Sequence, residues 1–339
     1  MSSTAPPTGE TLASQLQKLH TTLPAITFRP QADILGCELP QAQVYLQHYG
    51  LDGLIDDPSC RHFLGRTHCC GYNIAGQYWL PASPSGTVFV VHGYFDHVGL
   101  YGHLIRHLLD CGLAVVAFDL PGHGLSDGER VTIASFDHYV DVFETVVGLA
   151  EANLPQPWHT VGQSTGGAIV LNHLLAKPEL QTFDNVALLA PLLHPRNWSV
   201  NKMAYKLCHR ILPSIWRSFQ TNSSDAAFVD FLKDQDPLQA RHIPLEWIGA
   251  MSRWAEAFHL FPESTQRLRV IQGDRDTTLD WRYNMAQLRT KFPAGEFHLV
   301  PGARHHLVNE SPILRQQVFS CMGFEKLPSS QDETKRLEA

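Results

Sequence analysis

The chain has 339 residues and a net charge of −7, with 26 Lys and Arg against 33 Asp and Glu. The hydrophobic share of 44% is ordinary for a globular protein, and the negative charge argues against general binding to nucleic acid. The longest apolar runs, at residues 113–118 and 186–193, are far shorter than the roughly 18–20 residues of a membrane-spanning helix. The first 19 residues lack the basic and apolar regions of a signal peptide, and the seven cysteines have no metal-site spacing. These features together predict a cytoplasmic protein with reduced thiols.

The predicted elements change in character along the chain. Residues 1–20 are polar with a weak helical stripe, and we expect them to be a loose lead-in. A short helix is predicted at residues 39–49, and a hairpin at residues 62–79 that turns at Cys70 and Gly71. Strands are then predicted at 87–91, 113–118, 159–161, 185–190, 268–272 and 297–300, and helices at 101–111, 137–152, 167–176, 281–292 and 313–324. Continuously apolar strands that alternate with helices are typical of an α/β fold with a mostly parallel, doubly wound sheet.

One long segment interrupts this alternation. Residues 192–261 are rich in aromatic side chains and contain no clear strand, and we interpret them as an inserted helical cap. The alternative is that these aromatic residues form an ordinary hydrophobic core. The cap divides an α/β core formed by residues 71–191 and 262–326. Residues 1–70 are an N-terminal extension without an assigned role, and residues 327–339 are predicted to be disordered.

A serine lies on a sharp turn between a predicted strand and a predicted helix. Gly162, Ser164 and Gly166 have the G-x-S-x-G spacing of a nucleophile elbow, in which a strained turn presents the serine above the sheet edge. Larger side chains two residues before or after the serine would clash, which explains glycine at both positions. The motif predicts Ser164 as a nucleophile.

Acyl transfer by a serine also needs a base and an acid that orients the base, and both should follow strands of the sheet. Asp276 follows the predicted strand at 268–272, and His305 follows the one at 297–300. The order Ser164, Asp276, His305 is that of α/β-hydrolases. Rival candidates are Asp274 and Asp280 for the acid and His306 for the base. Asp280 stands where an N-cap belongs, directly before the helix at 281–292.

The developing oxyanion needs two hydrogen-bond donors. One is the backbone N–H of Thr165, at the N-terminus of the helix that follows the elbow. The other is the backbone N–H of Tyr94, in the turn formed by His92, Gly93 and Tyr94 after the strand at 87–91. A glycine turn without a catalytic task is the alternative for this second position.

Two further motifs carry a resemblance to a known family. Residues 91–97 read VHGYFDH and residues 118–128 read FDLPGHGLSDG, and with the elbow and the acid and base loops they resemble the monoacylglycerol lipase and lysophospholipase group of α/β-hydrolases, often filed with the serine aminopeptidase S33 hydrolases. The resemblance covers roughly residues 72–325. It implies an α/β-hydrolase fold with an inserted cap. It also implies the following site: nucleophile Ser164, base His305, acid Asp276, and oxyanion donors Tyr94 and Thr165.

Two departures from the family pattern concern the acyl pocket. The family usually has His and Met on either side of the serine, where this chain has Gln163 and Thr165. The position after His-Gly is often small in the family, where this chain has Tyr94. Because the oxyanion donors are backbone N–H groups, which tolerate either change, the differences bear on the acyl pocket and the substrate rather than on the mechanism.

The expected activity is hydrolysis of carboxylic esters through an acyl-enzyme, with no metal or cofactor. The expected substrates are lipid-like esters such as monoacylglycerol or lysophospholipid. Alternatives on the same triad are a proline-releasing aminopeptidase, a C–C bond hydrolase and a thioesterase. A non-catalytic binding protein of this fold is a further alternative. Epoxide hydrolases and dehalogenases use an aspartate nucleophile, which Ser164 argues against.

The cap also carries a pattern of charged and apolar residues that bears on lipid binding. Residues 185–224 contain no Asp or Glu. Lys202, Lys206 and Arg210 are spaced to share one face of a helix, with apolar residues on another face. This pattern suggests peripheral contact with an anionic membrane surface, and the alternative is an ordinary solvated cap helix.

Overall fold

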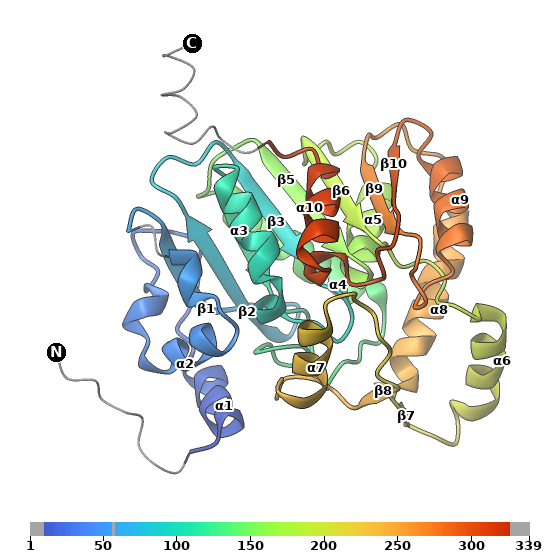
Figure 1. Cartoon of the computed structure of the whole chain (residues 1–339), viewed down its shortest axis with the longest axis horizontal. Coiled ribbons are helices and arrows are strands. Elements are labelled where there is room, and N and C mark those ends of the chain that lie inside the picture. The colour runs from blue at the N-terminus through green and yellow to red at the C-terminus, as the bar shows by residue number, and fades with distance from the viewer. Residues whose placement is uncertain (1–9, 56–57, 326–339) are drawn as a thin grey trace.

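The computed structural model describes residues 10–55 and 58–325, which form one eight-stranded sheet covered by helices on both faces (Figure 1). The strands are β1 (Arg61–Cys69), β2 (Tyr72–Leu80), β3 (Thr87–Val91), β4 (Ala114–Phe118), β5 (Trp158–Gln163), β6 (Asn185–Leu189), β9 (Arg269–Gly273) and β10 (Glu296–Val300). Their order is β1-β2-β4-β3-β5-β6-β9-β10. Strand β2 is antiparallel to both neighbours, and the remaining pairs are parallel. The predicted α/β fold class is therefore confirmed.

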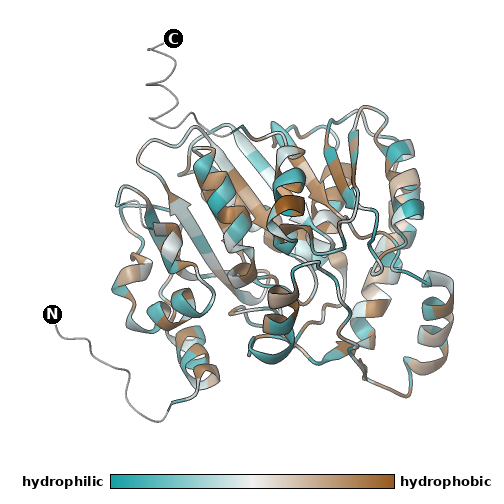
Figure 2. Ribbon diagram, viewed as in Figure 1, coloured by the Kyte–Doolittle hydropathy of each residue, from teal (hydrophilic) through white to brown (hydrophobic). Residues whose placement is uncertain are grey.

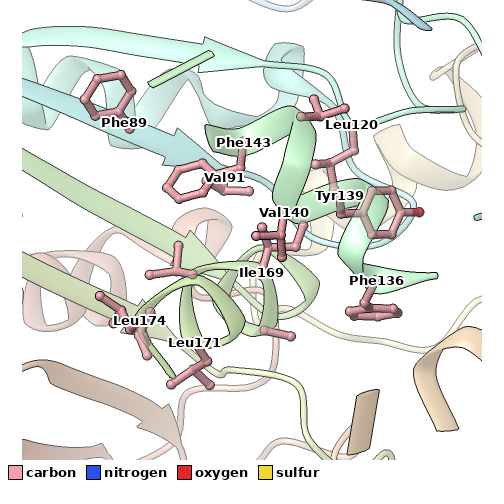
Figure 3. Close-up of a cluster of buried hydrophobic side chains, with 14 of the residues drawn as sticks. Phe89, Val91, Leu120, Phe136, Tyr139, Val140, Phe143, Ile169, Leu171 and Leu174 are labelled. Carbon is pink, nitrogen blue, oxygen red and sulfur yellow. The ribbon is translucent and has the colours of Figure 1, made fainter. Parts of the chain in front are cut away.

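Each face of the sheet has its own hydrophobic core. On β3, Val88 and Val90 pack on the face covered by α3 (Gly102–Asp110) and α10 (Pro312–Ser320). Phe89 and the other alternate residues of β3 pack on the opposite face, which is covered by α4 (Phe136–Glu151), α5 (Thr165–Ala176), α8 (Leu245–Leu260) and α9 (Trp281–Lys291). Figure 3 shows this second core between β3, α4 and α5. Strands β3 and β4 are apolar along nearly all of their length, as burial of both faces requires, and the sheet as a whole combines hydrophobic and hydrophilic stretches (Figure 2).

From Leu12 on, the N-terminal region is part of the fold rather than a loose lead-in, so that expectation was wrong for residues 12–20, and residues 1–9 lie outside the described residues. Helices α1 (Leu12–Thr22) and α2 (Pro40–His48) pack against each other, and Leu16 and Leu19 of α1 are buried in the core shared with α3 and α10. The side chain of Thr11 caps α1. A short amphipathic helix needs only a narrow apolar stripe to be held by tertiary packing, which explains the weak sequence signal.

The predicted hairpin is confirmed. Strands β1 and β2 pair in antiparallel register from Arg61 opposite Leu80 to Cys69 opposite Tyr72, and both residues of the turn between them have positive φ, at 53° and 83°. Two such residues form the turn type that matches the twist of paired strands. Because β1 lies within residues 1–70, the predicted extension contributes a strand to the main sheet.

The segment between β6 and β9 holds three helices and two short strands. These are α6 (Trp198–Cys208), β7 (Ser214–Trp216), α7 (Ala226–Asp234), β8 (His242–Pro244) and α8. Strands β7 and β8 pair in antiparallel register, where the sequence had indicated no clear strand. Helix α6 ends at Cys208, so Arg210 does not share a helix face with Lys202 and Lys206, contrary to the expectation. That residues 192–261 form a separate cap stays a proposal, and the word cap denotes only this segment of the chain.

The remaining elements are short. Four 3₁₀ helices are described: η1 (Gly36–Glu38), η2 (Asp52–Ile55), η3 (Val98–Tyr101) and η4 (Leu307–Asn309). In the part of the chain that the structure describes, none of the helices combines the length and the apolar character needed to cross a membrane. The tail predicted to be disordered, residues 327–339, lies outside the described residues.

Candidate active site

Ser164 occupies a strained turn between β5 and α5. Its φ of 52° and ψ of −111° are unusual for a residue with a side chain, and its N–H donates to the carbonyl of Leu189 at 2.9 Å. A Cβ atom on Gly166 would lie 2.0 Å from the carbonyl oxygen of Val91, and one on Gly162 would lie 2.7 Å from the backbone of Gly166. The close packing of backbone around the turn therefore requires glycine at both positions.

A hydrogen-bonded chain connects Ser164, His305 and Asp276. The Oγ of Ser164 lies 3.0 Å from Nε2 of His305, and Nδ1 of His305 lies 2.8 Å from Oδ2 of Asp276. All three residues are buried. The structure thus brings together three residues that are far apart in the sequence, in the arrangement that lets an imidazole accept a serine proton.

Asp276 is held as an ionised acceptor. Its carboxylate accepts hydrogen bonds from the side chain of Gln272 at 3.0 Å and from the backbone N–H groups of Thr278 and Leu279 at 2.7 and 3.0 Å. Burial raises the pKa of this carboxyl, but His305 and these donors outweigh burial and lower the pKa below its usual value. An ionised Asp276 fixes the proton of His305 on Nδ1 and leaves Nε2 free to accept the proton of Ser164.

The pKa of His305 is raised above its ordinary value of 6.5. Burial lowers the pKa, but the charge of Asp276 and its hydrogen bond raise it by more, and Asp96 adds to this effect. The stabilised imidazolium is the form that His305 would adopt after taking a proton from Ser164.

The rival candidates have other partners. His306 contacts Asp96 through Nε2 at 3.1 Å, and Asp274 accepts the N–H of Gly302 at 2.7 Å. Asp280 accepts the N–H of Tyr283 at 3.4 Å and caps α9, as predicted.

The turn after β3 is fixed against the elbow by a buried tyrosine. The N–H of Gly93 donates to the hydroxyl of Tyr101 at 2.9 Å, and this hydroxyl donates to Asp96 at 2.8 Å. A Cβ on Gly93 would lie 2.8 Å from Asp96 and 3.4 Å from the Cβ of Ser164, so glycine is needed here for close approach. Because the N–H of Gly93 is occupied, that of Tyr94 is the candidate donor from this turn.

Thr165 is the first residue of α5, so its N–H precedes the first hydrogen bond within the helix. Thr165, Tyr94 and Ser164 all line one cavity. The two predicted oxyanion donors therefore come from separate segments, the turn after β3 and the start of α5, and both residues line the cavity at Ser164.

Two residues that sequence reasoning passed over tie these loops together. The Nε2 of His92 accepts the N–H of Leu120 at 2.9 Å, and its Nδ1 donates to the carbonyl of Gly93 at 2.8 Å. Asp119 accepts the N–H groups of Val98 and Leu125, each at 2.7 Å. The signal lay in the motifs at 91–97 and 118–128, which had indicated the family resemblance and, at residues 92–94, the oxyanion turn, but no role for the side chains of His92 and Asp119.

The cavity at Ser164 has a volume of about 460 Å³, which is in the usual range for small-molecule sites. Its apolar lining comes largely from the cap: Trp198, Ala204, Ile215, Ile243, Leu245, Ile248 and Met251. The ring of Tyr94 stacks on Trp247 with centroids 3.7 Å apart, and its hydroxyl donates to the carbonyl of Val131 at 2.6 Å. The bulky residue after His-Gly thus forms a fixed wall of the cavity.

A buried aspartate after α7 joins three regions of the chain. Asp236 accepts hydrogen bonds from the hydroxyl of Tyr49 at 2.7 Å and from Gln239 at 2.8 Å, and lies 3.0 Å from Nε2 of His97. Gln239 also donates to the carbonyl of Phe95 at 3.0 Å. The N-terminal region and the cap therefore both contact the loop that carries Tyr94. Sequence reasoning missed this cluster because its members are remote in the chain and match no motif.

Comparison with known proteins decides the family. The sequence model of the family described as "Serine aminopeptidase, S33" matches residues 82–312, more than half of the chain. The chain belongs to this family. The human monoglyceride lipase is 30% identical over 258 residues, which cover 72% of this chain and 83% of the relative. Phospholipase YtpA of Bacillus subtilis (strain 168) is 24% identical over 260 residues, covering 72% of this chain and 95% of the relative.

The solved structures agree on the fold. A soluble variant of the monoglyceride lipase of Saccharomyces cerevisiae, in complex with a substrate analogue, superposes with a TM-score of 0.65 at 19% identity and covers 76% of this chain and 92% of that one. This S33 family member is accordingly an ester-hydrolysing enzyme of the α/β-hydrolase fold, as predicted.

Proposed function

We propose that the protein hydrolyses carboxylic esters of single-chain lipids, either monoacylglycerols or lysophospholipids, through an acyl-enzyme on Ser164. The observation that carries the proposal is the hydrogen-bonded chain of Ser164, His305 and Asp276 beside a largely apolar cavity. The names of the relatives, a monoglyceride lipase and a phospholipase, support a lipid substrate.

The proposed reaction has two halves. His305 takes the proton of Ser164 as the Oγ attacks the ester carbonyl, and the backbone N–H groups of Tyr94 and Thr165 bind the oxyanion. His305 then protonates the departing alcohol. In the second half, water attacks the acyl-enzyme with His305 again as base, and the fatty acid leaves. Asp276 orients the imidazole and stabilises its charged form throughout.

Covalent labelling and a substrate panel test this proposal. A fluorophosphonate probe should label the wild type at Ser164 and should fail to label the His305→Ala variant, because the reaction needs an activated serine. The substrate panel comprises monoacylglycerol, lysophospholipid, p-nitrophenyl esters of graded length and a prolyl anilide. Faster cleavage of the prolyl anilide than of every ester would favour the aminopeptidase alternative and contradict the proposal.

We also propose that the cap contacts a lipid surface through exposed apolar side chains. Val200, Met203, Leu207 and Ile211 are 69%, 60%, 70% and 79% exposed, and lie on or directly after α6, whose residues Trp198, Ala204 and Tyr205 line the cavity. An apolar patch at a cavity wall would let a lipid pass from a membrane to the site. Lys202 is paired with Glu256 at 2.6 Å, so apolar contact carries more of this proposal than charge.

Liposome flotation tests the membrane proposal. Replacing Val200, Met203, Leu207 and Ile211 by Ser should reduce the bound fraction several-fold, with hydrolysis of a short soluble ester retained. The control is a double variant of two equally exposed apolar residues outside this patch, Leu260→Ser with Ile313→Ser, which should bind as the wild type does. Equal losses of liposome binding in both variants would contradict a membrane-binding surface that is specific to the patch on α6.

A further inference from the structure

A half-buried arginine lines the same cavity as Ser164. The guanidinium of Arg217 lies over two aromatic rings, 3.8 Å from the ring centroid of Phe95 and 4.4 Å from that of Phe219. Phe95 directly follows Tyr94, the candidate oxyanion donor. The stacking holds a planar cation in one orientation, close to the place where an ester would react.

The direct hydrogen-bond partners of this cation are neutral. Arg217 donates to the side-chain carbonyl of Gln239 at 2.6 Å and to the backbone carbonyl of Ala240 at 3.2 Å. Within the described ranges 10–55 and 58–325, no carboxylate oxygen lies within 4.0 Å of its nitrogens. A guanidinium has five N–H donors, so these two contacts leave further N–H groups of Arg217 that can bind a ligand. Burial lowers the pKa of Arg217 to about 10, which keeps it charged at neutral pH.

The two carboxylates whose charge acts on Arg217, Asp96 and Asp236, are engaged elsewhere. Asp96 contacts His306 at 3.1 Å and accepts the hydroxyl of Tyr101. Asp236 contacts His97 and accepts from Tyr49. Both carboxylates attract Arg217 from a distance, but neither forms an ion pair with it. The arginine can therefore accept a substrate anion without first breaking a salt bridge.

The position of the arginine indicates which part of a substrate it would meet. Ser218, Gln220 and Asn222 continue from Arg217 as a polar wall of the cavity, whereas α6 and α8 supply apolar side chains. The backbone carbonyl of Asn222 accepts the N–H groups of His305 and His306, at 3.0 and 2.8 Å. The polar wall is thus held beside the candidate base, His305. An acyl chain would bind instead against the apolar side chains of α6 and α8.

From these contacts we infer that the substrate carries an anionic group, a phosphate or a carboxylate, on the alcohol side of its ester, and that Arg217 binds it. This inference rests on the proposed function and narrows it from single-chain lipid esters to anionic ones. Arg217 would pair with the anion through two parallel N–H groups, as guanidinium groups do with phosphate and carboxylate.

Binding of three non-hydrolysable dodecyl ethers, measured by calorimetry below their micelle concentrations, tests the inference. They are dodecylglycerol (neutral), dodecylglycerol 3-phosphate and dodecyloxyacetate. The wild type should bind the phosphate about tenfold or more tightly than the neutral ether, and Arg217→Gln should abolish this difference. Arg217→Lys keeps the positive charge but lacks the planar guanidinium, and it should retain part of the difference in affinity between the phosphate and the neutral ether. Tighter binding of dodecyloxyacetate as well would identify a general anion site, whereas tighter binding of the phosphate alone would identify a phosphate site.

Arg241→Gln is the matched control, because Arg241 lies 4.8 Å from the ring of Phe219 but does not line the cavity. This variant should keep the wild-type preference. Equal binding of neutral and anionic ethers by the wild type would overturn the inference, and so would an equal loss for all three ethers in Arg217→Gln. Because ether binding needs no turnover, this outcome is distinguishable from a failure to hydrolyse the ester panel.

Discussion

The loops at the strand ends and the cap are held in place by different kinds of contact. Around Ser164, backbone packs on backbone: Gly166 touches Val91, and Gly93 lies against the serine. The cap is joined to the core by backbone hydrogen bonds at points such as Asn222, but its cavity walls meet the core through side chains, such as Gln239 on Phe95 and Trp247 on Tyr94. It also exposes the apolar residues of α6 to solvent.

This difference separates chemistry from substrate choice. Backbone contacts and a short hydrogen-bonded chain tolerate little change, because shifting them misaligns reacting atoms. Side-chain walls can change size and charge without moving the triad. We therefore expect substitutions in the strand-end loops to alter kcat by orders of magnitude, and substitutions farther away to have smaller effects.

The largest expected effect is that of Ser164→Ala, which removes the proposed nucleophile. Activity on a p-nitrophenyl ester should fall by about 10⁶-fold, the scale seen for such nucleophiles, with unchanged thermal unfolding. Ser252→Ala, at a buried serine of α8, is the control and should retain activity. Near-normal turnover by Ser164→Ala would exclude the proposed mechanism.

Asp276→Asn should lower kcat by about 10⁴-fold, because the amide no longer holds His305 in the reactive tautomer. KM should change little, since Asp276 contacts Nδ1 of His305, on the side of the imidazole that faces away from Ser164. Asp274→Asn, two residues earlier, is the matched control and should stay within a few-fold of the wild type, because Asp274 contacts Gly302 and not His305. If the two variants lost activity equally, the assignment of the acid would be wrong.

The pH profile reports on the same hydrogen bond. His305 must be neutral to act as base, so kcat/KM should fall about tenfold per pH unit in acid, with its midpoint above 6.5 because Asp276 raises the pKa of His305. In Asp276→Asn the residual activity should titrate at lower pH, since burial then dominates. If the midpoint were the same in the wild type and in Asp276→Asn, Asp276 would not be what raises the pKa of His305.

Tyr49→Phe tests the contact between the N-terminal region and Asp236 of the cap. Loss of one hydrogen bond to the buried carboxylate of Asp236 should reduce the free energy of unfolding by about 1–3 kcal/mol in urea titrations. We expect kcat to fall a few-fold with KM nearly constant, because His97 shares Asp236. Tyr283→Phe, at an exposed tyrosine hydrogen bond, is the control. A stability loss without a change in kcat would make this contact purely structural.

Much of the core was predictable because its signals are local. Apolar strands that alternate with helices predicted the parallel sheet, and the paired positive-φ positions at Cys70 and Gly71 match the predicted hairpin turn. The residues of the candidate triad could be named because each follows a strand, and the carboxyl ends of parallel strands meet at one edge.

The failures of prediction share one cause. Helix α1 was missed because packing rather than propensity holds it, and Arg210 was placed on a helix that ends two residues earlier. Arg217 was given no role because a sequence does not show which cation enters a cavity. In each case the deciding contacts come from residues remote in the chain.

The sequence by itself thus determined the fold class, the elbow around Ser164 and the candidate acid and base, because strained turns and buried strands leave local patterns. Only the tertiary structure decided that Asp276 rather than Asp274 meets His305, that Asp236 joins the N-terminal region to the cap, and that Arg217 enters the cavity. These are questions of distance between side chains, and such distances are set by the packing of the whole chain.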